Sequence, residues 1–207
     1  MKKSNIIIGA IVAIAVVTAF ITGNKSSWSD TERALITNCN DSIMHLWTID
    51  NASDSLFLRN VCAPLTLRDI QDGLYEHLKA GMLATVTDPR NEGVGIAAPQ
   101  VGIGRRLIAV QRYDKAGEPF EFYVNPRLIY LSDTTQTGTE GCLSIPDMHG
   151  EVARSTSIIV EYNDETTFLP RRDTVSGFTA VIFQHEIDHL EGILYIDRAI
   201  YVINEAN

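Results

Sequence analysis

Cysteine and basic residues are both scarce in this chain of 207 residues, and each shortage argues against a class of protein. Three cysteines provide no disulfide framework, although Cys39 and Cys62 could pair in an oxidising compartment. The 17 lysines and arginines are outnumbered by 26 acidic residues, and the formal net charge of −9 argues against a surface that binds nucleic acid. The sequence also contains no internal repeat or low-complexity tract. Its length suits one core preceded by an N-terminal extension.

The N-terminal extension contains an uncharged apolar segment that follows Lys2 and Lys3. Its length is at the short end of the ~17–25 residues that span a membrane as a helix, and the pattern also fits a secretion signal. We therefore expect residues 4–22 to anchor the protein in a membrane or to direct its export. The side of the membrane and the cleavage of the segment stay open.

Near the C-terminus the sequence carries an HExxH motif at the end of an apolar run, residues 178–183, that looks helical. Residues four apart lie on one face of a helix, so His185 and His189 can hold one metal ion together. Glu186 projects beside that face and can reach a metal-bound water as a general base. A helix can also carry such residues at its surface or in a core, so the third ligand decides the interpretation.

The third ligand should come from upstream, because the downstream positions that other HExxH enzymes use are closed. Tyr195 occupies the place of a later histidine, and the chain ends before a glutamate roughly twenty residues further on could occur. Cys142 stands apart among the candidates, because Gly141 before it and Pro146 after it suit a loop that presents one thiolate. The other upstream candidates are His45, His77, His149, Cys39 and Cys62.

A glycine-rich stretch, residues 93–102, is the third segment of interest, since small residues let a substrate backbone approach closely. Alone it is most simply a turn. Together, however, the segments GVGIAAPQVG, EGCLSIP and QHEIDHLEG resemble, in this order, the three motifs of the peptide deformylase family. The resemblance covers roughly Leu56 to Arg198, and three motifs in the right order are far more specific than HExxH alone.

The resemblance implies a metal-dependent hydrolase that removes the formyl group from N-formylmethionyl peptides and releases formate. Water bound to the metal would attack the formyl carbon, with Glu186 as general base. A thiolate with two imidazoles suits iron(II), zinc, nickel or cobalt, and the family favours iron(II) as the single divalent ion. The oligomeric state is not predicted.

The resemblance also assigns roles to individual residues. The negative charge on the carbonyl oxygen would be stabilised by the side-chain amide of Gln100 and the backbone N–H of Leu143. The peptide would lie as an added strand beside the loop of Gly93 and Gly95. The expected metal ligands are Cys142, His185 and His189.

The apolar pattern predicts an α+β fold, with small antiparallel or mixed sheets wrapped around a central C-terminal metal-binding helix. Apolar residues at every fourth position from Ile70 to Met82 predict one helix, which Thr66 and Asp69 would cap. The last helix would be capped by Ser176 and closed by Gly192, with Phe178 on the same core-facing stripe as the histidines. Short apolar runs predict strands at 107–111, 120–124 and 128–131 and a hairpin of 157–162 with 166–169.

We expect three parts in the chain: a hydrophobic segment with a polar linker at 1–30, a second linker at 31–55, and a catalytic domain at 56–207. Two other functions remain open from the sequence. A metallopeptidase would cleave internal peptide bonds, and a non-catalytic domain would bind metal without turnover.

Overall fold

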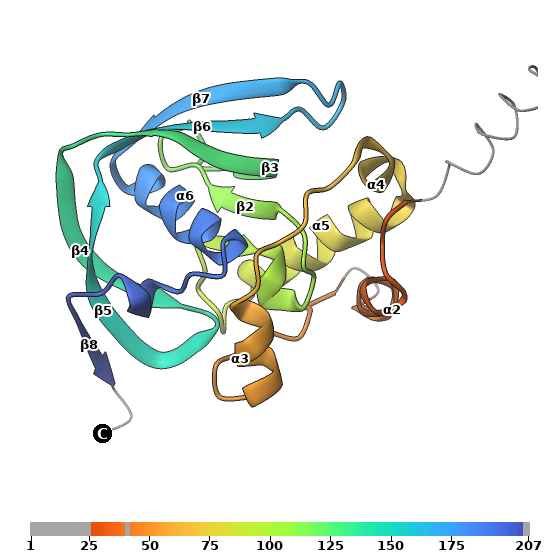
Figure 1. Ribbon diagram of the computed structural model, residues 1–207, viewed down its shortest axis with the longest axis horizontal. Helices are drawn as coiled ribbons and strands as arrows, with labels where there is room; N and C mark the ends of the chain where they lie inside the picture. Colours follow the sequence, from red (N-terminus) through yellow and green to blue (C-terminus); the bar gives the residue numbers. More distant parts are fainter. Residues whose placement is uncertain (1–25, 40–41, 205–207) are drawn as a thin grey trace, which may run out of the picture.

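The computed structural model describes residues 26–39 and 42–204, and in it two antiparallel sheets enclose one helix (Figure 1). The larger sheet has the order β1-β2-β3-β6-β7 and the smaller has the order β4-β5-β8. Helix α6 (Gly177–Leu190) packs against strands of both sheets. The predicted α+β fold with a central C-terminal helix is therefore confirmed. The strands are β1 (Gly95–Ala97), β2 (Leu107–Gln111), β3 (Phe120–Leu131), β4 (Thr135–Cys142), β5 (Ile145–Ser155), β6 (Ser157–Asn163), β7 (Pro170–Ser176) and β8 (Tyr201–Asn204).

The helix predicted from Ile70 to Met82 is divided in two at Asp72, whose backbone is extended. This residue ends the first helix, and its side chain accepts a hydrogen bond from the N–H of Leu74 at 3.1 Å, which starts the second. Thr66 forms the expected capping box with Asp69. The helices outside the sheets are α2 (Asp30–Cys39), α3 (Ala52–Leu58), α4 (Leu67–Gln71) and α5 (Gly73–Val86), with short 3₁₀ turns η1 (Ala98–Val101) and η2 (Tyr195–Asp197).

The hairpin of β6 and β7 corrects one predicted strand. Residues 166–169 are not a strand, because the N–H of Asp164 bonds to the carbonyl of Leu169 and closes a turn across them. The side chain of Asp164 also accepts hydrogen bonds from the N–H groups of Thr166 and Thr167. Phe168, with φ of 58°, packs its ring against the core from within this turn. The partner of β6 is therefore β7, which starts at Pro170.

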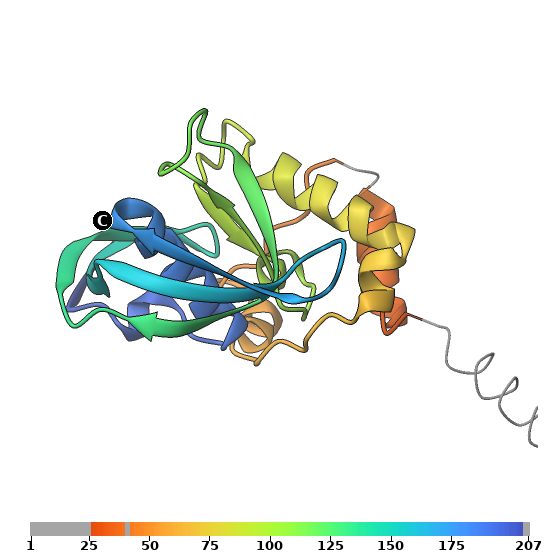
Figure 2. The ribbon, with the colours of Figure 1, turned by 90° about the horizontal axis from the view of Figure 1, so that it is seen from above.

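The segment before the sheets is also ordered against the core. Helix α2 crosses and packs against α5, as Figure 2 shows for the red-orange and yellow helices. Arg105 is buried and donates two hydrogen bonds to Glu32 of α2, at 2.7 and 2.9 Å. The predicted division of the chain into parts at residues 30 and 55 stays a prediction.

The structure corrects the expectation of a membrane-associated or exported protein. That expectation rested on residues 4–22, which lie outside the described residues. Within 26–39 and 42–204, no helix combines the length and apolar character that crossing a bilayer requires. The longest helices there, α5 and α6, have 14 residues each. At 1.5 Å per residue they reach about 21 Å, against a hydrocarbon core of about 30 Å.

Candidate active site

Helix α6 carries the three residues of the HExxH motif into the interior between the two sheets. His189 is 1% exposed and Glu186 is 4% exposed, and His185 lies one turn before His189. Ser176 takes the N-cap position, although its side chain makes no capping hydrogen bond. The helix ends as predicted near Gly192, whose φ of 70° suits the left-handed turn after a helix. The motif residues are thus fixed on a buried, regular helix.

The hairpin of β4 and β5 brings Cys142 to the same place from the smaller sheet. The register of the two strands shifts between Gly141 and Cys142, at the end of β4. The Sγ atom of Cys142 lies 3.3 Å from Nε2 of His189. One donor atom from each of Cys142, His185 and His189 lies within 4.8 Å of the other two. The structure therefore brings the three predicted ligands together, and one ion could contact all of them.

A buried chain of charged side chains orients His185. The carboxylate of Glu140 lies 2.8 Å from Nδ1 of His185 and accepts two hydrogen bonds from Arg154, at 2.7 and 2.9 Å. Arg154 also donates to Asp188, which in turn accepts from Arg198. Burial alone would raise the pKa of Glu140, but the bonds from Arg154 and His185 outweigh it and lower the pKa to about 2. Glu140 therefore stays ionised, and its bond to Nδ1 leaves Nε2 of His185 available for a metal.

Glu186 lies in an environment that suits a group that accepts and returns a proton. Burial raises the pKa of its carboxyl to about 7. Its Oε2 atom is buried and has no hydrogen-bond partner among the described residues. Gly95 of β1 allows this placement, because a Cβ atom there would lie 2.5 Å from Oε1 of Glu186 and 2.8 Å from Cγ2 of Ile182. The glycine-rich loop and the helix are thus in direct contact.

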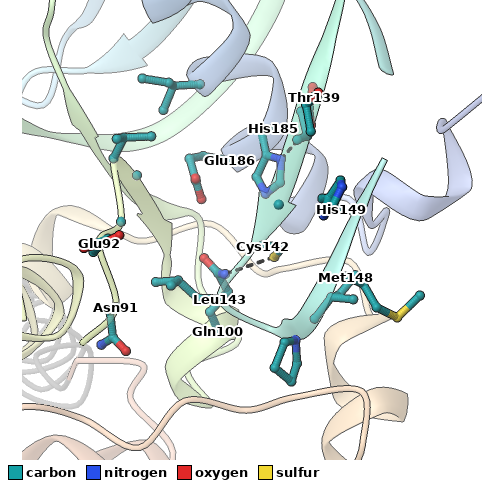
Figure 3. A pocket seen from close by; sticks show the side chains of 18 of the residues that line it. Asn91, Glu92, Gln100, Thr139, Cys142, Leu143, Met148, His149, His185 and Glu186 are labelled. Atoms are coloured by element: carbon teal, nitrogen blue, oxygen red, sulfur yellow. Dashed lines mark hydrogen bonds and ion pairs between the residues drawn. The ribbon is translucent and has the colours of Figure 1, made fainter. Parts of the chain in front are cut away.

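Gln100 and Leu143 both line the same cavity, close to Cys142 (Figure 3). Gln100 is on η1, and its Oε1 accepts a hydrogen bond of 2.8 Å from the N–H of Ala97. That bond turns Nε2 towards the site, where it lies 3.5 Å from Sγ of Cys142. Leu143 is in the turn between β4 and β5, directly after Cys142. Both predicted donors therefore border the space beside the candidate metal ligands.

The cavity has a volume of about 700 Å³ and also contains apolar residues that the sequence analysis did not assign to it. Phe178 was expected on the core-facing stripe, but it is 54% exposed at the start of α6 and its ring lies 5.3 Å from that of Tyr113. It lines the cavity instead, and His149 does so as well. His45 and His77 are exposed and do not line it. The other apolar lining residues near α6 are Val94, Val181 and Ile182.

Comparison with known proteins shows which family the chain resembles. Residues 46–203 match the family described as polypeptide deformylase. A peptide deformylase of Roseiflexus castenholzii is 33% identical over 168 residues, which are 75% of this chain and 88% of that protein. One of Desulforudis audaxviator is 42% identical over 125 residues, 60% of this chain and 77% of that protein.

Solved structures of the same kind are also similar. A class I type b peptide deformylase from Acinetobacter baumannii, solved with Met-Ala-Ser bound, has a TM-score of 0.67 and 34% identity, with 76% of this chain and 99% of that chain covered. The Thermotoga maritima peptide deformylase has a TM-score of 0.65 and 30% identity, with 77% and 99% covered. The chain therefore belongs to the peptide deformylase family of hydrolases.

Proposed function

We propose that the protein removes the formyl group from N-formylmethionyl peptides in a reaction that depends on one divalent metal ion. Enzymes of this family act on formylmethionyl peptides. The observation that carries the proposal is the meeting of a thiol from β4 with two imidazoles from α6, next to a buried carboxyl group. This combination is suited to metal-assisted hydrolysis.

The proposed metal ligands are Cys142, His185 and His189. Three protein ligands suit a catalytic ion, which keeps one position for water or substrate. A bound divalent ion supplies Lewis-acid chemistry, since it lowers the pKa of coordinated water towards about 7 and polarises a carbonyl group. One thiolate with two imidazoles suits iron(II), zinc, nickel and cobalt, and we propose iron(II) by analogy with the family.

Glu186 is proposed to move the proton. Its carboxylate accepts a proton from the water that attacks the formyl carbon, and then delivers this proton to the departing amine of the peptide. A pKa of about 7 suits both steps, because the group can hold and release a proton near neutral pH. Its neighbour Gly95 leaves room for the carboxylate to reach the cavity.

Gln100 and Leu143 are proposed to stabilise the negative charge that grows on the carbonyl oxygen. The Nε2 group of Gln100 and the backbone N–H of Leu143 are the two donors, and the first is already fixed by the bond from Ala97 to its Oε1. Each preorganised donor of this type contributes about 3–4 kcal/mol to catalysis.

The peptide is proposed to lie between the two sheets as an added strand. β1 is an edge strand of the larger sheet and β4 is an edge strand of the smaller, and residues of both line the cavity. Unpaired edges can hydrogen-bond an extended peptide. Gly93 and Gly95 on one side allow its backbone to approach closely, and Phe178, Val181 and Ile182 offer apolar contacts for the methionine side chain.

An assay of formate release from formyl-Met-Ala-Ser tests this function, with acetyl-Met-Ala-Ser and an internally cleavable peptide as comparisons. We expect formate from the first substrate and no cleavage of the other two. Cleavage of the internal peptide would support a metallopeptidase instead. Metal binding without turnover of any of the three would support a non-catalytic role.

A further inference from the structure

The two proposed oxyanion donors are attached to different sheets, so their separation depends on contacts between the two sheets. Gln100 is on η1, directly after β1 of the larger sheet, and Leu143 is in the turn of the smaller sheet. Stabilisation of a developing charge depends on donors that are held in place before the reaction. Gln100 Nε2 and Cys142 Sγ are in contact at 3.5 Å, but sulfur is a weak acceptor, so this bond alone holds the two parts only loosely.

One short segment, residues 44–49, forms backbone hydrogen bonds next to both donor positions. The backbone N–H of Trp47 donates to the carbonyl of Gln100 at 2.8 Å, and the N–H of Ile49 donates to the carbonyl of Ser144 at 3.0 Å. Its start is fixed to α5, because the N–H of Met44 donates to Oγ1 of Thr85 at 2.8 Å. The segment, which we call the strap, leads into α3 (orange in Figure 1).

Side chains of the strap strengthen both attachments. The indole of Trp47 lies against Gly102, where φ is 80° and a Cβ atom would be only 2.5 Å from Cε2 of the ring. Its other neighbour is the ring of Phe57 on α3, with ring centroids 4.5 Å apart. Ile49 and Cys142 pack against the same small apolar cluster, while Leu46 packs on the main core and lines the cavity.

We propose that the strap sets the separation of the two oxyanion donors, and that Trp47 is its main positioning residue. This inference rests on the proposed function, because it concerns the same reaction. Trp47 does not line the cavity, and it would act through the backbone of Gln100 and through the turn that contains Leu143. The strap thus joins the two sheets close to the two proposed donors, one of which is attached to each sheet.

The test compares Trp47→Ala with wild-type enzyme in the formyl-Met-Ala-Ser assay. Loss of one oxyanion donor costs about 10²–10³-fold in kcat, so a loosened pair of donors should cost about 10–100-fold. KM should change less than about twofold and the metal content should stay the same, because within the described residues the strap forms hydrogen bonds with Thr85, Gln100 and Ser144 and none with a proposed metal ligand. Trp47→Phe should recover most of the rate.

Trp28 provides a matched control, since it is the only other tryptophan and packs under Arg105 beside α2, away from the cavity. Trp28→Ala, or Trp28→Phe if the first does not fold, should lower the Tm and leave kcat unchanged below that Tm. A fall in kcat for this control as large as that for Trp47→Ala would show a general effect of destabilisation and overturn the proposal.

A double-mutant cycle tests whether the strap acts through the donors. In a Gln100→Ala background, Trp47→Ala should cost less than about threefold, because residues that act as one unit are not additive. Equal losses in both backgrounds, or an unchanged kcat for Trp47→Ala, would overturn the strap proposal while the deformylase function stands. Absence of formate release by metal-loaded wild-type enzyme would instead overturn the proposed function itself.

Discussion

At the scale of single residues, the proposed reaction depends first on the carboxyl group of Glu186. Replacement by glutamine keeps the size of the side chain and removes the proton acceptor. We expect Glu186→Gln to lower kcat by about 10²–10⁴-fold, the usual contribution of a general base. The metal content should be unchanged, because Glu186 is not a proposed ligand. Formate release and elemental analysis on the same sample check both points, and full activity in a metal-loaded variant would exclude Glu186 as the base.

Gly95 gives a second prediction at this scale. A methyl group there would collide with Oε1 of Glu186 and with Ile182, so Gly95→Ala must displace the carboxyl group or the strand. A misplacement of about 1 Å can cost about 10²-fold in rate. Gly138→Ala on β4 is the matched control, because no neighbouring atom of the described chain lies within 4 Å of its Cβ position. Steady-state kinetics should separate the two variants, and equal rates would contradict the close packing.

At the scale of elements, the hairpin of β4 and β5 both presents Cys142 and orients His185. The sequence motifs predicted the ligands, but they did not predict these strands. β4 consists mainly of exposed polar residues and glycine, so the alternation of apolar residues that marks a strand is missing. The hairpin is held by pairing with its neighbours and by the buried bonds of Arg154 to Glu140 and Asp188, and contacts so distant in sequence leave no local pattern.

The helices show the opposite case. The capping box of Thr66 and Asp69 and the end of α6 near Gly192 depend on adjacent residues, so they could be predicted. The break at Asp72 was missed, because an apolar repeat of four continues through it and only the cap reveals the new start. Phe178 was misplaced for a related reason, since periodicity identifies a stripe on a helix but does not show where the stripe leaves the core.

Glu140 offers a test of the hairpin as an orienting element. Glu140→Gln removes the charge between Arg154 and His185 while its shape is kept. Mutation of a residue that orients a metal ligand typically lowers the metal affinity by about 10–100-fold. We therefore expect Glu140→Gln to lose its metal at a chelator concentration about 10–100-fold lower than the wild type does. Glu151→Gln on β5 is the control, because Glu151 accepts a hydrogen bond from Thr139 and is not among the residues that orient His185. Equal metal retention in the two variants would contradict the orienting role.

At the scale of the whole molecule, α2 is attached to the sheets by the ion pair of Glu32 and Arg105, whose side chains are each 10% exposed. Burial raises the pKa of Glu32, but hydrogen bonds from Arg105 and from Ser29 outweigh it and lower the pKa below its usual 4.5. A lowered pKa in the folded state means that the stabilisation is complete above the unfolded pKa and is lost as the pH falls through the folded value.

The difference in stability between wild type and Glu32→Gln should therefore be fully present at pH 7, at about 2 kcal/mol, and should shrink as the pH falls below 4.5 and through the lowered pKa of Glu32. Thermal unfolding across this range measures it. Glu76→Gln is the control, since the side chain of Glu76 is 72% exposed where it pairs with Lys79, and loss of its charge should change stability by less than about 1 kcal/mol. A difference for Glu32→Gln that does not vary with pH would contradict the ionic attachment of α2.

The most direct test of the account is X-ray absorption at the metal edge of anaerobically prepared protein, combined with elemental analysis. The proposed site predicts one divalent ion per chain, with one sulfur ligand from Cys142 and two nitrogen ligands from His185 and His189. Cys142→Ser should remove the sulfur signal. A metal spectrum without sulfur in the wild-type protein, or one that Cys142→Ser leaves unchanged, would contradict the proposed convergence of β4 and α6 on one ion.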